Sequence, residues 1–243
     1  MAIISQTIDY RDGDTPLSGL LYADHARAGK RPGLLLLHHG GGLDDHAKSR
    51  SQSFAQLGFI VFACDMYGRG IAGHRERTTA LLMEMRDNPG KLVARARAGL
   101  DVLSAHPLVD GRLAAIGYCF GGMTVLQMAR SGMPLLGVAS VHGSLTTVLP
   151  AVPGAIQAKV LVCHGALDPH VPMAHVTTFV EEMREAGADW QLILYGGAMH
   201  GFTHQRPTRM PGVAYNQAAD ARSTVAIKEF FLELFGPLDS WEA

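Results

Sequence analysis

Cysteine is scarce in this 243-residue chain, and neither sign of charge is in excess. Its three cysteines, Cys64, Cys119 and Cys163, are too few and too far apart for a disulfide framework, and their odd number leaves at least one thiol free. We therefore expect a reducing compartment. The formal net charge of −1 provides no basic excess for binding nucleic acid or an anionic membrane surface.

Long apolar runs are also scarce. No run approaches the roughly 18 residues needed to span a bilayer, and the first residues lack the pattern of a secretory signal. These absences favour a cytoplasmic protein with no membrane partner. The composition, 47% apolar and 18% charged, is typical of a globular enzyme, and the length suits one domain over residues 1–243.

Apolar runs of strand length alternate with segments of helical character. Buried parallel strands are expected at residues 33–39, 59–64, 113–118, 135–141, 159–165 and 190–196. Helices are expected at about 93–103, 122–130, 173–183 and 218–235. The runs SQTIDYRDG and LSGLLYAD predict a hairpin. This order predicts an α/β fold, with a doubly wound, mostly parallel sheet and an N-terminal antiparallel hairpin at its edge.

One cysteine lies at a glycine-flanked turn, in the stretch AAIGYCFGGM. Gly117 and Gly121 stand two residues on either side of Cys119, where a tight strand-to-helix turn requires residues without a β-carbon. This is the nucleophile-elbow pattern with sulfur in place of serine oxygen. The dipole of the helix that follows favours a thiolate, so we predict that Cys119 is a nucleophile rather than a small buried apolar residue.

A carboxylate and an imidazole follow in the chain order that such a nucleophile requires. Asp168 comes just after the strand KVLVCHG, and His200 comes just after WQLILYG. We predict that they are the acid and the base that activate the thiol. Other residues occupy similar positions, namely His164 and His170 beside the acid, and His38, His39 and Asp65 at earlier strand ends. Of these, Asp65 is expected to cap or anchor a loop.

Two backbone donors are expected to hold the oxyanion. Phe120 follows the nucleophile directly, and Gly40 lies in the glycine run after the strand GLLLLHH. Side chains near two other strand ends are expected to line the pocket, although plain packing is an equal alternative. They are Met66, Tyr67 and Arg69 after one strand, and Met199 and Phe202 beside His200.

The sequence resembles the dienelactone hydrolase family of α/β-hydrolases over nearly its full length. The resemblance is carried by GYCFGG at 117–122, by residues 38–70, by HGALDPHVP at 164–172 and by MHGFTH at 199–204. It implies an α/β-hydrolase fold with Cys119, Asp168 and His200 as a catalytic triad. The implied substrates are lactones or activated esters, which react through an acyl-enzyme without a metal or organic cofactor.

Two positions depart from the best-known members of that family. His39 stands where the family carries a glutamate that contacts the resting cysteine, and His204 stands where an arginine binds the substrate carboxylate. Arg206 follows two residues later. The resemblance therefore makes His39 and His204 candidate substrate contacts, and leaves both the control of Cys119 ionisation and the identity of the ester open.

Three alternatives remain at this stage. The same scaffold serves peptidases and acyltransferases, and a silent α/β-hydrolase can act as a binding protein. A metal site is the third alternative, because His38, His39 and His46 lie near Asp44 and Asp45, although this acidic pair also suits a helix N-cap. The favoured expectation is a monomeric or homodimeric ester or lactone hydrolase with no metal, whose partner is its small-molecule substrate.

Overall fold

A single eight-stranded sheet forms the centre of the protein. The computed structural model describes residues 2–205 and 210–238. The strands run in the spatial order β1-β2-β4-β3-β5-β6-β7-β8. Their bounds are β1 Ile3–Asp12, β2 Thr15–Asp24, β3 Arg31–Leu37, β4 Ile60–Cys64, β5 Val109–Tyr118, β6 Gly137–Val141, β7 Lys159–Gly165 and β8 Trp190–Tyr195.

The pairing directions confirm the predicted sheet. β1 and β2 form an antiparallel hairpin, and β2 joins β4 antiparallel at the sheet edge. Every later pairing, from β4–β3 across to β7–β8, is parallel. Strands β3 and β4 are buried throughout, as expected for strands covered on both faces.

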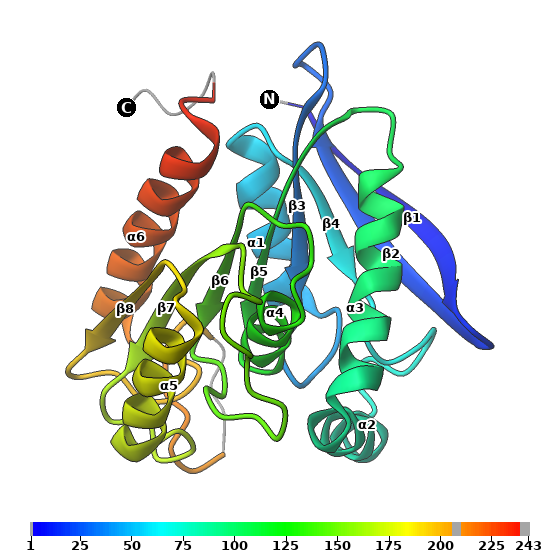
Figure 1. The fold of residues 1–243 in the computed structure, drawn as a ribbon. Coiled ribbons are helices and arrows are strands. Elements are labelled where there is room, and N and C mark those ends of the chain that lie inside the picture. The colour runs from blue at the N-terminus through cyan, green and yellow to red at the C-terminus, as the bar shows by residue number, and fades with distance from the viewer. Residues whose placement is uncertain (1, 206–209, 239–243) are drawn as a thin grey trace.

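Helices cover both faces of the sheet (Figure 1). Their bounds are α1 Asp45–Gln56, α2 Arg75–Asp87, α3 Pro89–Ser104, α4 Phe120–Arg130, α5 Met173–Ala186 and α6 Gln217–Phe235. Helices α3, α4 and α5 pack into one apolar core, while α1 and α6 pack into a second core on the opposite face. Within the described residues, no helix is both long enough and apolar enough to cross a bilayer.

Neither α1 nor α2 was among the predicted helices. Helix α2 buries only Thr78 and Met85, so its sequence lacks the apolar stripe that reveals a helix packed on a core. By contrast, the N-cap expected near 44–46 is confirmed, because the Asp44 carboxylate accepts the backbone N–H groups of His46 and Ala47. Because β3 to β8 are parallel, their carboxyl ends and the residues that follow them lie at the same edge of the sheet.

Candidate active site

Cys119 occupies a sharply turned junction between β5 and α4. Its backbone has φ 53° and ψ −110°, a conformation that residues other than glycine rarely adopt. A β-carbon at Gly117 would lie 2.0 Å from the Gly121 carbonyl oxygen, and one at Gly121 would lie 2.1 Å from the Leu37 carbonyl oxygen. Only glycine fits at these two positions, as the nucleophile-elbow pattern predicts. The strained turn brings the sulfur to the carboxyl edge of the sheet.

The three predicted catalytic side chains lie in one hydrogen-bonded line. His200 Nε2 is 3.1 Å from Cys119 Sγ, and His200 Nδ1 is 2.7 Å from Asp168 Oδ2. The other carboxylate oxygen of Asp168 accepts the backbone N–H groups of His170 at 2.8 Å and Val171 at 3.1 Å. These bonds fix the carboxylate, which in turn fixes the orientation of the imidazole. The geometry is that of a nucleophile, a base and an orienting acid.

Electrostatics at this line favour a thiolate and an imidazolium. Burial opposes ionisation of Cys119, yet the pKa of its thiol is lowered because His200, His39 and the backbone N–H of Gly40 stabilise the thiolate. Burial also opposes protonation of His200, but the Cys119 thiolate and the Asp168 carboxylate raise the pKa of His200 to about 10. The proton therefore rests on the imidazole.

No neighbouring cation stabilises the thiolate form of the other two cysteines strongly enough to offset burial. Cys64 and Cys163 are fully buried, one in each apolar core. Burial raises the pKa of each thiol to about 12. They are therefore protonated and shielded, whereas Cys119 is partly exposed.

A cavity of about 1050 Å³ opens over Cys119. Of the predicted site residues, its wall includes the two oxyanion candidates, Gly40 and Phe120, together with His39 and His204. Gly40 comes from the loop after β3, and Phe120 is the first residue of α4. The structure thus brings both oxyanion candidates to the cavity that lies over Cys119.

None of the five side chains predicted to line the pocket lies on the wall of this cavity; they are Met66, Tyr67, Arg69, Met199 and Phe202. Arg69 is turned to the surface, where it forms an ion pair with Asp9. Tyr67 and Phe202 are buried behind the wall, because the Tyr67 ring stacks on Phe120 with centroids 5.3 Å apart and Phe202 has no exposed surface. The Tyr67 and Phe202 side chains therefore support the wall rather than face a substrate. Arg206 lies outside the described residues.

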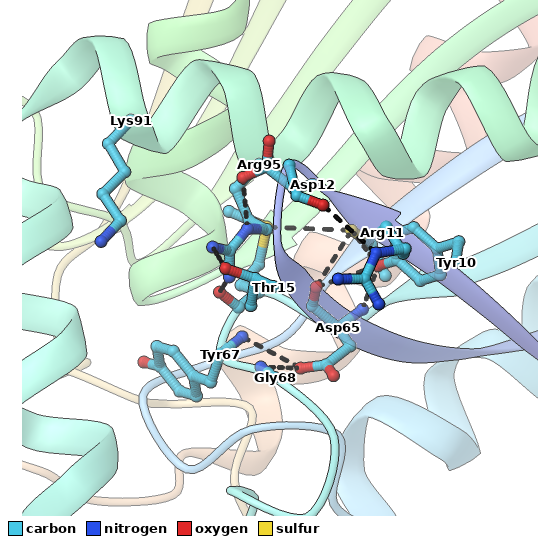
Figure 2. Close-up of polar contacts among 12 residues, drawn as sticks. Tyr10, Arg11, Asp12, Thr15, Asp65, Tyr67, Gly68, Lys91 and Arg95 are labelled. Carbon is cyan, nitrogen blue, oxygen red and sulfur yellow. Dashed lines mark hydrogen bonds and ion pairs between the residues drawn. The ribbon is translucent and has the colours of Figure 1, made fainter.

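The loop after β4 is held by Asp65, as its predicted anchoring role requires. Its carboxylate accepts the backbone N–H groups of Tyr67 at 2.9 Å and Gly68 at 3.0 Å (Figure 2). The buried Arg95 guanidinium donates to the Met66 carbonyl oxygen at 2.9 Å, which ties the same loop to α3. The position of Tyr67 behind Phe120 is therefore fixed from two sides.

Three histidine side chains, His39, His46 and His204, lie together on one side of the cavity. The Gly41 N–H donates to His39 Nδ1 at 3.0 Å, and His39 Nε2 lies 2.8 Å from the Asp44 carboxylate. The His46 and His204 rings stack with centroids 4.1 Å apart. Burial is the main reason that the pKa of His204 falls to about 3, so this imidazole is neutral.

The described residues contain no group of three or more His, Cys, Asp or Glu side chains placed to hold a metal ion.

His142 was missed by the sequence analysis. It follows β6 directly, is fully buried and has a positive φ of 42°. Its Nδ1 accepts the Cys119 backbone N–H at 3.1 Å, and its Nε2 is 2.9 Å from Thr203 Oγ1. A sequence signal existed, because His142 comes immediately after a predicted strand, at the same sheet edge as the other candidates.

Comparison with known proteins gives consistent results. The family model described as the dienelactone hydrolase family matches residues 17–235. Two solved structures, one described as m3DLH and one as a dienelactone hydrolase-like promiscuous phosphotriesterase from metagenomic libraries, are each 38% identical to this chain. Each match covers 97% of this chain and 100% of that structure, with TM-scores of 0.91 and 0.90.

A sequence relative is also described as an enzyme of this type. A putative carboxymethylenebutenolidase from Methylorubrum extorquens is 27% identical over 191 residues, which is 73% of this chain and 65% of that protein. Together with the two solved structures, this relative confirms the predicted resemblance and the α/β-hydrolase fold.

Proposed function

Because this chain belongs to the dienelactone hydrolase family and is a hydrolase of that type, we propose that it cleaves carboxylic esters or lactones through an acyl-enzyme on Cys119. The observation that carries the proposal is the Cys119–His200–Asp168 line, with separations of 3.1 and 2.7 Å, beneath a cavity of about 1050 Å³. A cavity of this size accommodates a small organic ester.

The proposed reaction begins with the thiolate. Cys119 Sγ attacks the acyl carbon, and the carbonyl electron pair moves to oxygen, where the Gly40 and Phe120 N–H groups hold the developing charge. The tetrahedral intermediate collapses to a thioester as the alkoxide leaves with the proton of the His200 imidazolium. His200 then removes a proton from water, and the hydroxide displaces the thiolate, which releases the carboxylic acid.

The ionisation of the pair favours esters over amides. A thiolate that exists before substrate arrives is a stable anion, so it leaves a tetrahedral intermediate more readily than an amine does. The intermediate from an activated ester therefore goes forward more readily than that from an amide. This argument favours an esterase or lactonase over a peptidase on the same scaffold.

A substrate panel tests the proposal. We expect p-nitrophenyl esters and simple lactones to be hydrolysed, and matched anilides to be inert. An aryl phosphotriester belongs in the panel, because one relative at 38% identity is described as a promiscuous phosphotriesterase. Cys119→Ala is expected to abolish turnover, whereas Cys163→Ala, which alters a buried thiol, is the matched control.

Other outcomes would redirect the proposal. Product formed only in the presence of an alcohol or amine acceptor would indicate an acyltransferase. Turnover that survives Cys119→Ala would contradict the assigned nucleophile. Binding of esters without any product would indicate a silent α/β-hydrolase.

A further inference from the structure

His142 connects the two segments that carry the reacting groups. On one side its Nδ1 accepts the N–H of Cys119, which also donates to the Val141 carbonyl oxygen at 2.9 Å. On the other side its Nε2 is 2.9 Å from the hydroxyl of Thr203, three residues after His200. Nδ1 must carry a lone pair to accept, so in a neutral ring the proton is on Nε2 and is donated to Thr203.

The surroundings keep this imidazole neutral and fixed. His142 has no exposed surface, and Thr203 is 1% exposed. Burial is the first cause that holds the pKa of His142 well below its ordinary value. The imidazoles that face it, from three other segments, act in the same direction; they are His200, His204, His46 and His39. The ring therefore bonds as a neutral donor and acceptor at neutral pH.

The link extends one step further. Thr203 Oγ1 is also 3.1 Å from His46 Nε2, which belongs to α1. A buried polar chain thus runs from the turn after β5, through the turn after β6 and the loop after β8, to α1 on the cavity wall. Such a chain is rigid only when each member has its partners.

We propose that His142 is a positioning residue that couples the Cys119 turn to the His200 loop and so maintains the separation of the thiol and imidazole. The left-handed backbone of His142 supports this, because a strained conformation persists only where the surrounding contacts determine it. The Cys119–His200 contact, at 3.1 Å, is within hydrogen-bond reach but sensitive to any shift of either segment. The proposal rests on the proposed roles of Cys119 and His200.

The test measures thiol ionisation as well as turnover. The rate of Cys119 alkylation by iodoacetamide is followed against pH, with the modified cysteine assigned by peptide mass spectrometry. Three variants are compared, Thr203→Val, His142→Asn and His142→Ala, together with the exposed control His25→Asn. Asparagine tolerates a positive φ and keeps an acceptor near the Cys119 N–H, but it is too short to reach Thr203.

We expect each of the three variants to move the alkylation midpoint towards that of an ordinary thiol, near pH ~8.5. Ester turnover, kcat, is expected to fall by about tenfold with KM little changed, since a displaced catalytic pair affects chemistry rather than binding. The double variant His142→Asn with Thr203→Val is expected to be no worse than the more affected single variant, since both break one link. His25→Asn is expected to match the wild type.

Unchanged midpoints in folded Thr203→Val and His142→Asn proteins would overturn the proposal. If His142→Ala does not fold, these two variants decide alone. A low wild-type midpoint that the variants raise, in a protein that hydrolyses no ester, would support the positioning role while refuting the proposed function.

Discussion

At the scale of single residues, the proposed chemistry rests on Cys119 and His200. Each shifts the other's ionisation, so the two titrations belong to the pair rather than to either group. The Cys119 pKa is lowered and the His200 pKa is raised to about 10, so the ion pair is lost when the pH falls through the first value or rises through the second. The reactive form therefore occupies the interval between them.

Substituting the base tests this pairing. In His200→Asn the group that stabilises the thiolate most is gone while burial still opposes ionisation, so the pKa of the thiol is expected to rise to at least the free value of about 8.5. Iodoacetamide alkylation of Cys119 at neutral pH should slow by more than about tenfold, which corresponds to over one pKa unit. His175→Asn, a partly exposed histidine of α5, serves as the control. An unchanged alkylation rate would show that His200 does not stabilise the thiolate.

Several residue roles could be predicted because sequence order and strand ends place them. Cys119, Asp168 and His200 each follow a strand that its apolar run predicts, and parallel strands bring such positions together. Tyr67, Arg69 and Phe202 also follow or approach strand ends, yet side-chain direction is set by partners such as Asp9, which adjacency in sequence cannot reveal. His142 was overlooked because no motif accompanies it.

At the scale of elements, the β5–turn–α4 junction depends on close backbone approach. Alanine at Gly121 would place its β-carbon 2.1 Å from the Leu37 carbonyl oxygen, so β3 and α4 would have to separate. We expect Gly121→Ala to destabilise the fold by about 3 kcal/mol and to abolish the ordered elbow.

Gly196→Ala is the matched control for this prediction. Its added β-carbon would meet no atom within 4 Å, so little change in stability is expected. Urea unfolding of both variants measures the difference. Equal midpoints would mean that the elbow accommodates a side chain and that the two elements are not held as closely as described.

Elements with a strong apolar period were predictable, and those without one were not. Helices α3, α5 and α6 contain the predicted segments, since buried residues recur along one face of each. Helix α2, polar on most of its surface, lies beside the cavity and contributes Thr78, Thr79 and Leu82 to its wall. Only Met85 of α2 is buried in the apolar core, with Leu81 and Leu82 packed against it, so no clear periodic signal marks this helix.

At the scale of the whole molecule, we propose that residues 1–243 are one domain. The two apolar cores lie on opposite faces of the same sheet and share its strands, so neither face can unfold while the other remains intact. Cys64 belongs to one core and Cys163 to the other, which provides a reporter on each side.

These two thiols make cooperativity measurable. In a Cys119→Ala background, Cys64 and Cys163 are expected to become reactive to a thiol reagent at the same urea concentration, because the faces unfold together. Mass spectrometry of cleaved peptides follows each thiol separately. Two clearly separated midpoints would contradict the single-domain proposal and indicate that one layer opens before the other.

The central claim, that Cys119 carries the acyl group, is tested most directly by rapid-quench intact-mass measurement after mixing with a p-nitrophenyl ester. The account predicts an added acyl mass on the native chain and on Cys163→Ala, lost at later times as the ester is consumed, and no added mass on Cys119→Ala. An equal adduct on Cys119→Ala, or hydrolysis by the native chain with no adduct at any quench time, would contradict it.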